Sequence, residues 1–120
     1  MILVDTSIWV PYLRAGNSKL EHLLNDAEVA CHPFIIGELA CGNIKNRTEI
    51  LSLLNALPKV NLLDNEEVLL FIERNNLMGK GLGLIDIHLL ASAILSEAAL
   101  WTSDIKLKHE AQISGMAYEY

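Results

Sequence analysis

Short apolar runs, each ended by polar residues or by glycine, recur along the chain. The first runs from Ile2 to Val4 and is followed at once by Asp5, Thr6 and Ser7. A run of this kind is typical of a buried strand in a sheet that is covered on both faces. We predict further strands at residues 28–31, 59–63, 98–102 and 115–118.

Between these runs, apolar residues recur every three or four positions, which predicts amphipathic helices. The first helix is expected at residues 7–14, with Thr6 or Ser7 as its N-cap and with Pro11 tolerated only in its first turn. The others are expected at residues 18–27, 33–41, 46–57, from 65 onward, 84–97 and 104–112.

The predicted helices differ in how much of their surface is apolar. Leu53 and Leu69 are among the positions expected to face inward in their helices. The helix at 84–97 is apolar nearly all round, so it should be the most deeply buried. The stretch 78–83, which holds three glycines, is expected to be the most flexible part of the chain.

Short strands that alternate with helices are typical of an α/β fold with a parallel sheet. We therefore predict a three-layer α/β sandwich, in which a short central parallel β-sheet is flanked by helices on both faces. The 120 residues suit one domain, residues 1–120, with a single core.

Composition narrows the class of protein. Apolar residues make up 52% and charged residues 20% of the chain, but no run of about 18 apolar residues is long enough for a membrane span. The start of the chain lacks the basic and long apolar regions of a secretion signal. We therefore expect a cytoplasmic protein that does not associate with a membrane. Cys31 and Cys41 lack the close-paired spacing of zinc ligands, and we expect two reduced thiols.

The net charge of −6, from nine basic and fifteen acidic residues, argues against a general polyanion binder. Four acids, however, stand in apolar surroundings. Asp5 and Asp104 each follow a predicted strand, Glu38 lies at the edge of an apolar helix face, and Asp86 is flanked by leucine and isoleucine. Helix capping is the simple alternative for Asp5 and Asp104. Burial of Asp86 as an ion would cost several kcal/mol unless it is paired or binds a metal.

If these four carboxylates converge, they form a metal site. Two carboxylates about 4 Å apart repel by around 4 kcal/mol at an effective dielectric constant of 20, a cost that a bound cation offsets. Ligands that are all oxygen select Mg²⁺ or Mn²⁺. Such ions generate hydroxide and hold the attacking and leaving oxygens of a phosphodiester in line.

The chain resembles the PIN-domain ribonucleases, and more closely the VapC-like toxins of bacterial toxin–antitoxin pairs. The matching segments are Val4-Asp5-Thr6-Ser7, His32-Pro33 with Ile36-Gly37-Glu38-Leu39 and Gly42, Gly79-Lys80-Gly81-Leu82-Gly83, Asp86 to Ser92, and Leu100-Trp101-Thr102-Ser103-Asp104. They are spread in order over almost the whole chain.

This resemblance implies a PIN-like fold and a Mg²⁺-dependent endoribonuclease that acts as a toxin on an RNA substrate. It implies an acidic cluster of Asp5, Glu38, Asp86 and Asp104, with Thr6 and Thr102 as supporting hydroxyls. It also implies a homodimer and a VapB-like antitoxin that inserts a segment into the active-site groove. Ser103 and Ile105 stand where relatives often carry basic residues.

Several basic residues are candidates for contacts with the RNA backbone. The simple alternative for each is a surface charge exposed to solvent. They are Arg14, Lys45, Arg47, Lys80, Lys106 and Lys108. His88, two residues after Asp86, points away from it around a helix, and we interpret it as a structural residue rather than a catalytic base.

Two other functions stay open from the sequence. One is a PIN-like module that binds protein without catalysis. The other is a receiver-type phosphoacceptor domain, although Asp5 is followed by Thr6-Ser7 and not by a second acid. Transfer, ribosomal and messenger RNA all remain possible substrates of the nuclease.

Overall fold

The computed structural model describes residues 1–119, which form three strands and seven helices. In chain order these are β1 (Ile2–Val4), α1 (Thr6–Ala15), α2 (Ser18–Asn25), β2 (Val29–Ala30), α3 (Pro33–Cys41), α4 (Arg47–Ala56), α5 (Asn65–Arg74), α6 (Leu84–Ser96), β3 (Ala99–Trp101) and α7 (Ile105–Ile113).

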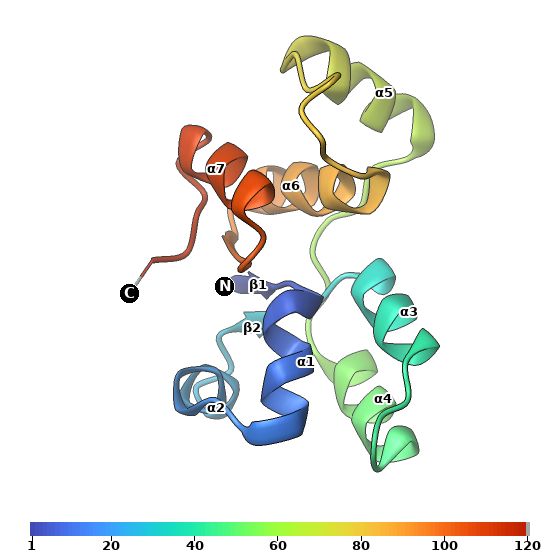
Figure 1. The fold of residues 1–120 in the computed structure, drawn as a ribbon, viewed down its shortest axis with the longest axis vertical. Helices are drawn as coiled ribbons and strands as arrows, with labels where there is room; N and C mark the ends of the chain where they lie inside the picture. The colour runs from blue at the N-terminus through green and yellow to red at the C-terminus, as the bar shows by residue number, and fades with distance from the viewer. Residues whose placement is uncertain (120) are drawn as a thin grey trace.

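The strands form one parallel sheet in the order β2-β1-β3. The helices lie on both sides of it, with α6 and α7 on one side and α1 and α2 on the other, while α5 extends beyond α6 (Figure 1). Helix α3 packs against both α1 and α4. The predicted α/β sandwich with a short central parallel sheet is therefore confirmed.

The two outer strands of the prediction are each reduced to a single bridge. Lys59 pairs with Cys31 at one edge of the sheet, and Ala117 pairs with Leu100 at the other. Beyond Val60 the chain leaves the sheet, because the N–H of Asn61 donates to Oγ of Ser96 at 2.8 Å instead of to a neighbouring strand. The prediction of full strands at 59–63 and 115–118 is wrong.

The core lies between the sheet and the helices. Strand β1 is buried along its whole length, and Leu3 and Val4 have no exposed surface. Residues 87–93 of α6 are all buried, as expected for the helix with apolar residues all round, although Leu84 and Leu95 near its ends are exposed. Within residues 1–119, no helix is both long enough and apolar enough to span a membrane.

Helix α1 departs from the prediction at its start. It begins at Thr6 with Asp5 in the N-cap position, and Pro11 lies inside the helix rather than in its first turn. Proline has no N–H and therefore leaves the carbonyl of Ser7 without its usual helical partner. Trp9, which is 1% exposed, anchors the helix in the core, and the burial of this large side chain offsets the cost.

Other helix limits follow local signals. Helix α3 runs from Pro33 to Cys41, as predicted, and Asp64 caps α5 by exchanging hydrogen bonds with Glu67. Helix α2 ends two residues before the predicted end at Ala27. Leu53 and Leu69, expected to face inward, are 48% and 54% exposed, so the apolar stripes of α4 and α5 are narrower than predicted.

Candidate active site

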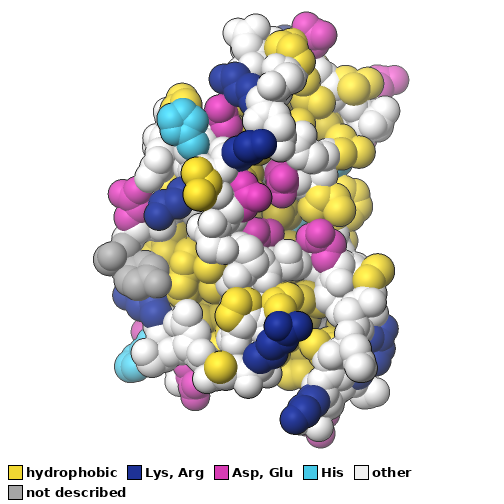
Figure 2. Space-filling model, viewed as in Figure 1, with side chains coloured by type: hydrophobic (Ala, Val, Ile, Leu, Met, Phe, Trp, Pro, Cys, Tyr) yellow, Lys and Arg dark blue, Asp and Glu magenta, His cyan; other side chains and the backbone are white. Residues whose placement is uncertain are grey.

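The four acids singled out in the sequence line one open hollow at the carboxyl ends of the strands. Asp5 follows β1, Asp104 caps α7 after β3, Glu38 lies in α3, and Asp86 lies in the first turn of α6. We call this the acidic hollow. Acidic side chains gather near the middle of the face shown in Figure 2. Three separate helices and the sheet therefore contribute to one site.

Asp5 is 6% exposed, and hydroxyl groups rather than basic residues hold its carboxylate. Its Oδ2 atom accepts hydrogen bonds from Oγ of Ser7 at 2.8 Å and from Oγ1 of Thr102 at 2.9 Å. Thr6 makes a longer contact of 3.5 Å to Oδ1. The side chain caps no helix. The simple alternative of an N-cap therefore does not account for the buried carboxylate of Asp5.

The same hydroxyls also fix the loop after β3. Oγ of Ser7 accepts the N–H of Ser103 at 3.0 Å, and Oγ1 of Thr102 accepts the N–H of Asp104 at 3.1 Å. Each hydroxyl thus gives its one proton to Asp5 and accepts a backbone N–H. Ser7 was not among the predicted supporting residues, because its partners Thr102 and Ser103 lie near the far end of the chain. Its position two residues after Asp5 was the one feature of the sequence that could have indicated this role.

Asp104 and Asp86 each combine a place at the hollow with a local hydrogen bond. Oδ1 of Asp104 accepts the N–H of Leu107 at 3.0 Å, so the helix-capping interpretation holds for this residue. Oδ2 of Asp86 accepts the N–H of Gly83 at 3.3 Å. Both carboxylates are oriented by helix starts, where partial positive charge favours an anion.

Two carboxylates of the hollow, Asp86 and Glu38, have raised pKa values. Burial raises the pKa of Asp86, the Gly83 N–H opposes this, and the charges of Asp104 and Asp5 raise it further. Burial also raises the pKa of Glu38, as do Asp5 and Asp86, whereas a hydrogen bond from Thr6 lowers it. Within residues 1–119 no salt bridge reaches these four carboxylates, so the acidic hollow concentrates negative charge.

The donor set fits a hard divalent cation. As placed, no three His, Cys, Asp or Glu side chains within residues 1–119 converge closely enough to ligate one ion. Mg²⁺ usually keeps several water ligands and takes one or two protein carboxylates, so a wide ring of carboxylates suits it better than a tight cage. The all-oxygen chemistry of the hollow and the raised pKa values of Glu38 and Asp86 support this fit.

Comparison with known proteins assigns the family. The family model described as "PIN domain" matches residues 2–112. The chain belongs to the PIN-domain family. It is also 47% identical over 118 residues to a protein named Ribonuclease VapC32 in two strains of Mycobacterium tuberculosis, CDC 1551 / Oshkosh and ATCC 25618 / H37Rv. The match covers 98% of this chain and 95% of each relative, so the expected similarity to VapC-like proteins is confirmed.

Membership of the PIN family removes the receiver-type alternative.

The basic residues that were candidates for RNA contacts are dispersed over the PIN domain. Arg14 and Lys45 line a second hollow beside the acidic one. The guanidinium of Arg47 instead donates to the carbonyls of Gly42 at 3.1 Å and Ala40 at 2.5 Å. Arg47 therefore holds the backbone around the end of α3, and its role as an RNA contact stays a prediction.

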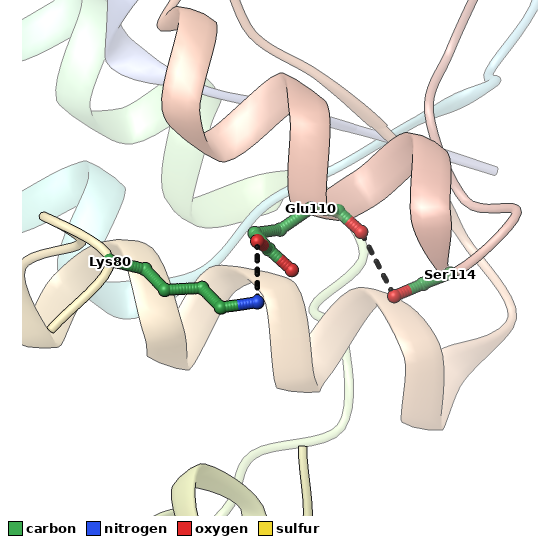
Figure 3. Close-up of polar contacts among 3 residues, drawn as sticks. All are labelled: Lys80, Glu110 and Ser114. Carbon is green, nitrogen blue, oxygen red and sulfur yellow. Dashed lines mark hydrogen bonds and ion pairs between the residues drawn. The ribbon is translucent and has the colours of Figure 1, made fainter. Parts of the chain in front are cut away.

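Lys80 and Lys106 lie between the 78–83 loop and α7. Nζ of Lys80 is 3.4 Å from Oε1 of Glu110, a residue whose backbone carbonyl also accepts the hydroxyl of Ser114 (Figure 3). Lys106 lies over Gly81, where a Cβ atom would fall 2.6 Å from its Nζ. These two lysines join the loop to the helix and do not line the acidic hollow.

His88 is 7% exposed and packs against aromatic rings, with ring centroids 4.8 Å from Phe34 and 6.3 Å from His32. Burial lowers its pKa. Its place in this ring cluster agrees with the interpretation of His88 as a structural residue.

Cys31 and Cys41 are free thiols, and Sγ of Cys31 contacts the carbonyl of His32 at 3.7 Å.

Proposed function

We propose that this PIN domain is a metal-dependent endoribonuclease of the VapC type. The observation that carries the proposal is the convergence of Asp5, Glu38, Asp86 and Asp104 on one hollow. The 47% identity to a protein named as a ribonuclease, over nearly the whole of both chains, supports it. The four carboxylates are the proposed metal-binding residues, of which one or two bind Mg²⁺ or Mn²⁺ directly and the others through water ligands of the ion.

A divalent ion at such a site supplies Lewis acidity and an activated water for phosphodiester hydrolysis. The chain's own residues hold the ligands in place. Ser7 and Thr102 lock the carboxylate of Asp5, and the N-terminus of α7 orients Asp104. The N–H of Gly83 orients Asp86, and the hydroxyl of Thr6 lowers the pKa of Glu38. The role of Thr6 and Thr102 is thus to position ligands.

The family resemblance also implies a partner, an oligomeric state and a location for this protein. We propose that residues 1–120 act as one nuclease domain, as the toxin of a pair with a VapB-like antitoxin. The proposal includes a homodimer in the cytoplasm and an RNA substrate. The match to the PIN-domain family and the identity to a protein named as a VapC ribonuclease support the comparison with this type of protein.

The first test is cleavage of a panel of transfer, ribosomal and messenger RNAs by purified protein with Mg²⁺, with Mn²⁺ and with a chelator. Asp86→Asn should abolish cleavage and weaken metal binding measured by calorimetry. Asp26→Asn, at an exposed position after α2, is the matched control and should behave as wild type. Absence of both cleavage and metal binding in wild type would favour the non-catalytic protein-binding module.

A further inference from the structure

A second hollow of about 550 Å³ adjoins the acidic one. Thr6, Val10 and Glu38 line both hollows, so the two open into each other along α1 and α3. Its size falls within the roughly 300–1,000 Å³ of typical ligand pockets. The second hollow is therefore a continuation of the proposed active site rather than a separate depression.

Besides Thr6 and Glu38, which it shares with the acidic hollow, and Gly42 and Asn43, the lining of the second hollow consists of two chemically distinct parts. One part is aliphatic and comes from both helices and the loop after α3, through Val10, Leu13, Leu39 and Ile44. The other part is cationic and consists of Arg14, near the end of α1, and Lys45, in the loop before α4. Basic side chains lie over the α1 and α4 part of the face, beyond the acidic group, in Figure 2.

The loop that carries Lys45 is held in shape. Arg47 donates from its two terminal nitrogens to the carbonyls of Gly42 and Ala40, which fixes the turn between α3 and α4. Asn43 and Ile44 lie within this turn and line the hollow. Arg47 is therefore a positioning residue for the wall, and the wall is formed before any ligand binds.

An aliphatic wall beside two cations suits one kind of ligand particularly well. A nucleotide of a single strand presents an unstacked base with apolar faces and an anionic phosphate, and proteins bind such strands through both parts. A duplex keeps its bases stacked inside and offers none to an aliphatic wall. The two cations line the second hollow but not the acidic one, so they offer a phosphate a place apart from the carboxylates.

We propose that the second hollow is a nucleotide subsite of the RNA-cleaving groove. It takes one nucleotide of single-stranded RNA next to the cleaved phosphodiester, with the base against Ile44 and the phosphate beside Arg14 and Lys45. This inference rests on the proposed ribonuclease function. It adds that base preference arises on the α1–α3 side of the groove.

The test uses the Asp86→Asn protein, which should bind RNA without cutting it, and fluorescence anisotropy of a labelled single-stranded oligoribonucleotide. Arg14→Ala and Lys45→Ala should each lower affinity about fivefold at 0.1 M salt, and reduce the slope of log affinity against log salt by about 0.7, as expected for one lost phosphate contact. Arg74→Ala, which removes an exposed charge from α5, is the control and should leave both values unchanged.

The base contact is tested with oligonucleotides that carry one abasic site at successive positions. One position should weaken binding to the Asp86→Asn protein and have little further effect when Ile44 is also changed to alanine. If Arg14→Ala and Lys45→Ala bind RNA as the control does, while wild type cleaves RNA, the subsite is wrong and the nuclease stands. In that case a protein segment becomes the better occupant. If wild type binds RNA through these residues but cleaves none of the RNAs, the hollow is an RNA-binding site, and both the nuclease and the place of the nucleotide next to a cleaved bond are wrong.

Discussion

The hydroxyl of Thr102 lies 2.9 Å from Oδ2 of Asp5 and so joins the carboxyl ends of β3 and β1 in a single hydrogen bond. The bond satisfies a carboxylate that is 6% exposed. We predict that Thr102→Val, which keeps the shape but removes the hydroxyl, lowers the free energy of unfolding by about 1–3 kcal/mol, because a buried charged acceptor loses a partner. Urea unfolding measures this.

Thr102→Ser is the matched control, since it keeps the hydroxyl and should retain most of the stability. Mg²⁺ affinity, measured by calorimetry, should fall in the valine variant and recover in the serine variant. Equal stability of the valine variant and wild type would show that Ser7 alone satisfies Asp5.

Substitution of Asp86 should change the free energy of unfolding in the opposite direction to Thr102→Val. Because burial and the charges of Asp104 and Asp5 raise its pKa, the ionised side chain is unfavourable in the metal-free protein. Asp86→Asn should therefore leave the metal-free protein as stable as wild type or slightly more stable, while metal binding and RNA cleavage are lost. Thermal unfolding in chelator and in Mg²⁺ separates the two effects. A clear loss of stability in chelator would make Asp86 a structural acid.

His32 makes the protein sensitive to mild acid. Its Nδ1 atom accepts the N–H of Phe34 at 2.9 Å and caps α3, so the neutral ring carries its proton on the buried Nε2. Burial, and secondarily His88, lowers the pKa of His32 from 6.5 to about 4. The unfolded chain therefore binds this proton first, and stability should be full above about pH 6.5 and fall as the pH drops towards 4.

The loss from this one group is at most about 3 kcal/mol. His32→Asn keeps a side-chain acceptor for the helix cap but does not titrate, so its unfolding free energy should vary less between pH 7 and pH 4.5. The raised pKa values of Glu38 and Asp86 act in the opposite direction, and both proteins share them. The difference between the two pH profiles is therefore the quantity to measure, and parallel profiles would contradict the prediction.

Local signals explain which parts of the fold were predictable. Pro33 and Gly42 bracket α3, and Asp64 with Glu67 marks the start of α5, because caps and stops act over a few residues. Strand pairing is non-local. The outer strands failed because the sequence does not reveal that Asn61 donates to Ser96 or that the chain meets Leu100 only around Ala117. Burial of Trp9 similarly overrode the local preference that places Pro11 at a helix start.

The same distinction applies to the site. The four acids were predictable, because carboxylates in apolar surroundings need a physical reason. The contacts around these acids were less predictable. Ser7 binds the loop after β3, and the partner of Lys80 lies in α7. The Ser7 contact depends on the pairing of β1 with β3, and the Lys80 contact depends on the packing of α6 against α7, which are both non-local.

The ion pair of Lys80 and Glu110 separates two interpretations of Lys80 (Figure 3). The side chain of Glu110 is 10% exposed and that of Lys80 is 44% exposed, so removal of the lysine leaves a nearly buried carboxylate unpaired. We predict that Lys80→Met lowers the free energy of unfolding by about 1–2 kcal/mol, between the effects for exposed and fully buried pairs. Glu110→Gln should cost less, because the freed lysine reaches water.

The double variant Lys80→Met with Glu110→Gln should be more stable than Lys80→Met alone, since the unpaired charge is then gone. The loop that contains Lys80 ends at Gly83, whose N–H orients Asp86, so Lys80→Met should also weaken Mg²⁺ binding and the double variant should restore part of it. A lysine that only contacts RNA would behave differently. Its loss would reduce RNA affinity and leave both unfolding and metal binding unchanged, and the Glu110 change would rescue nothing.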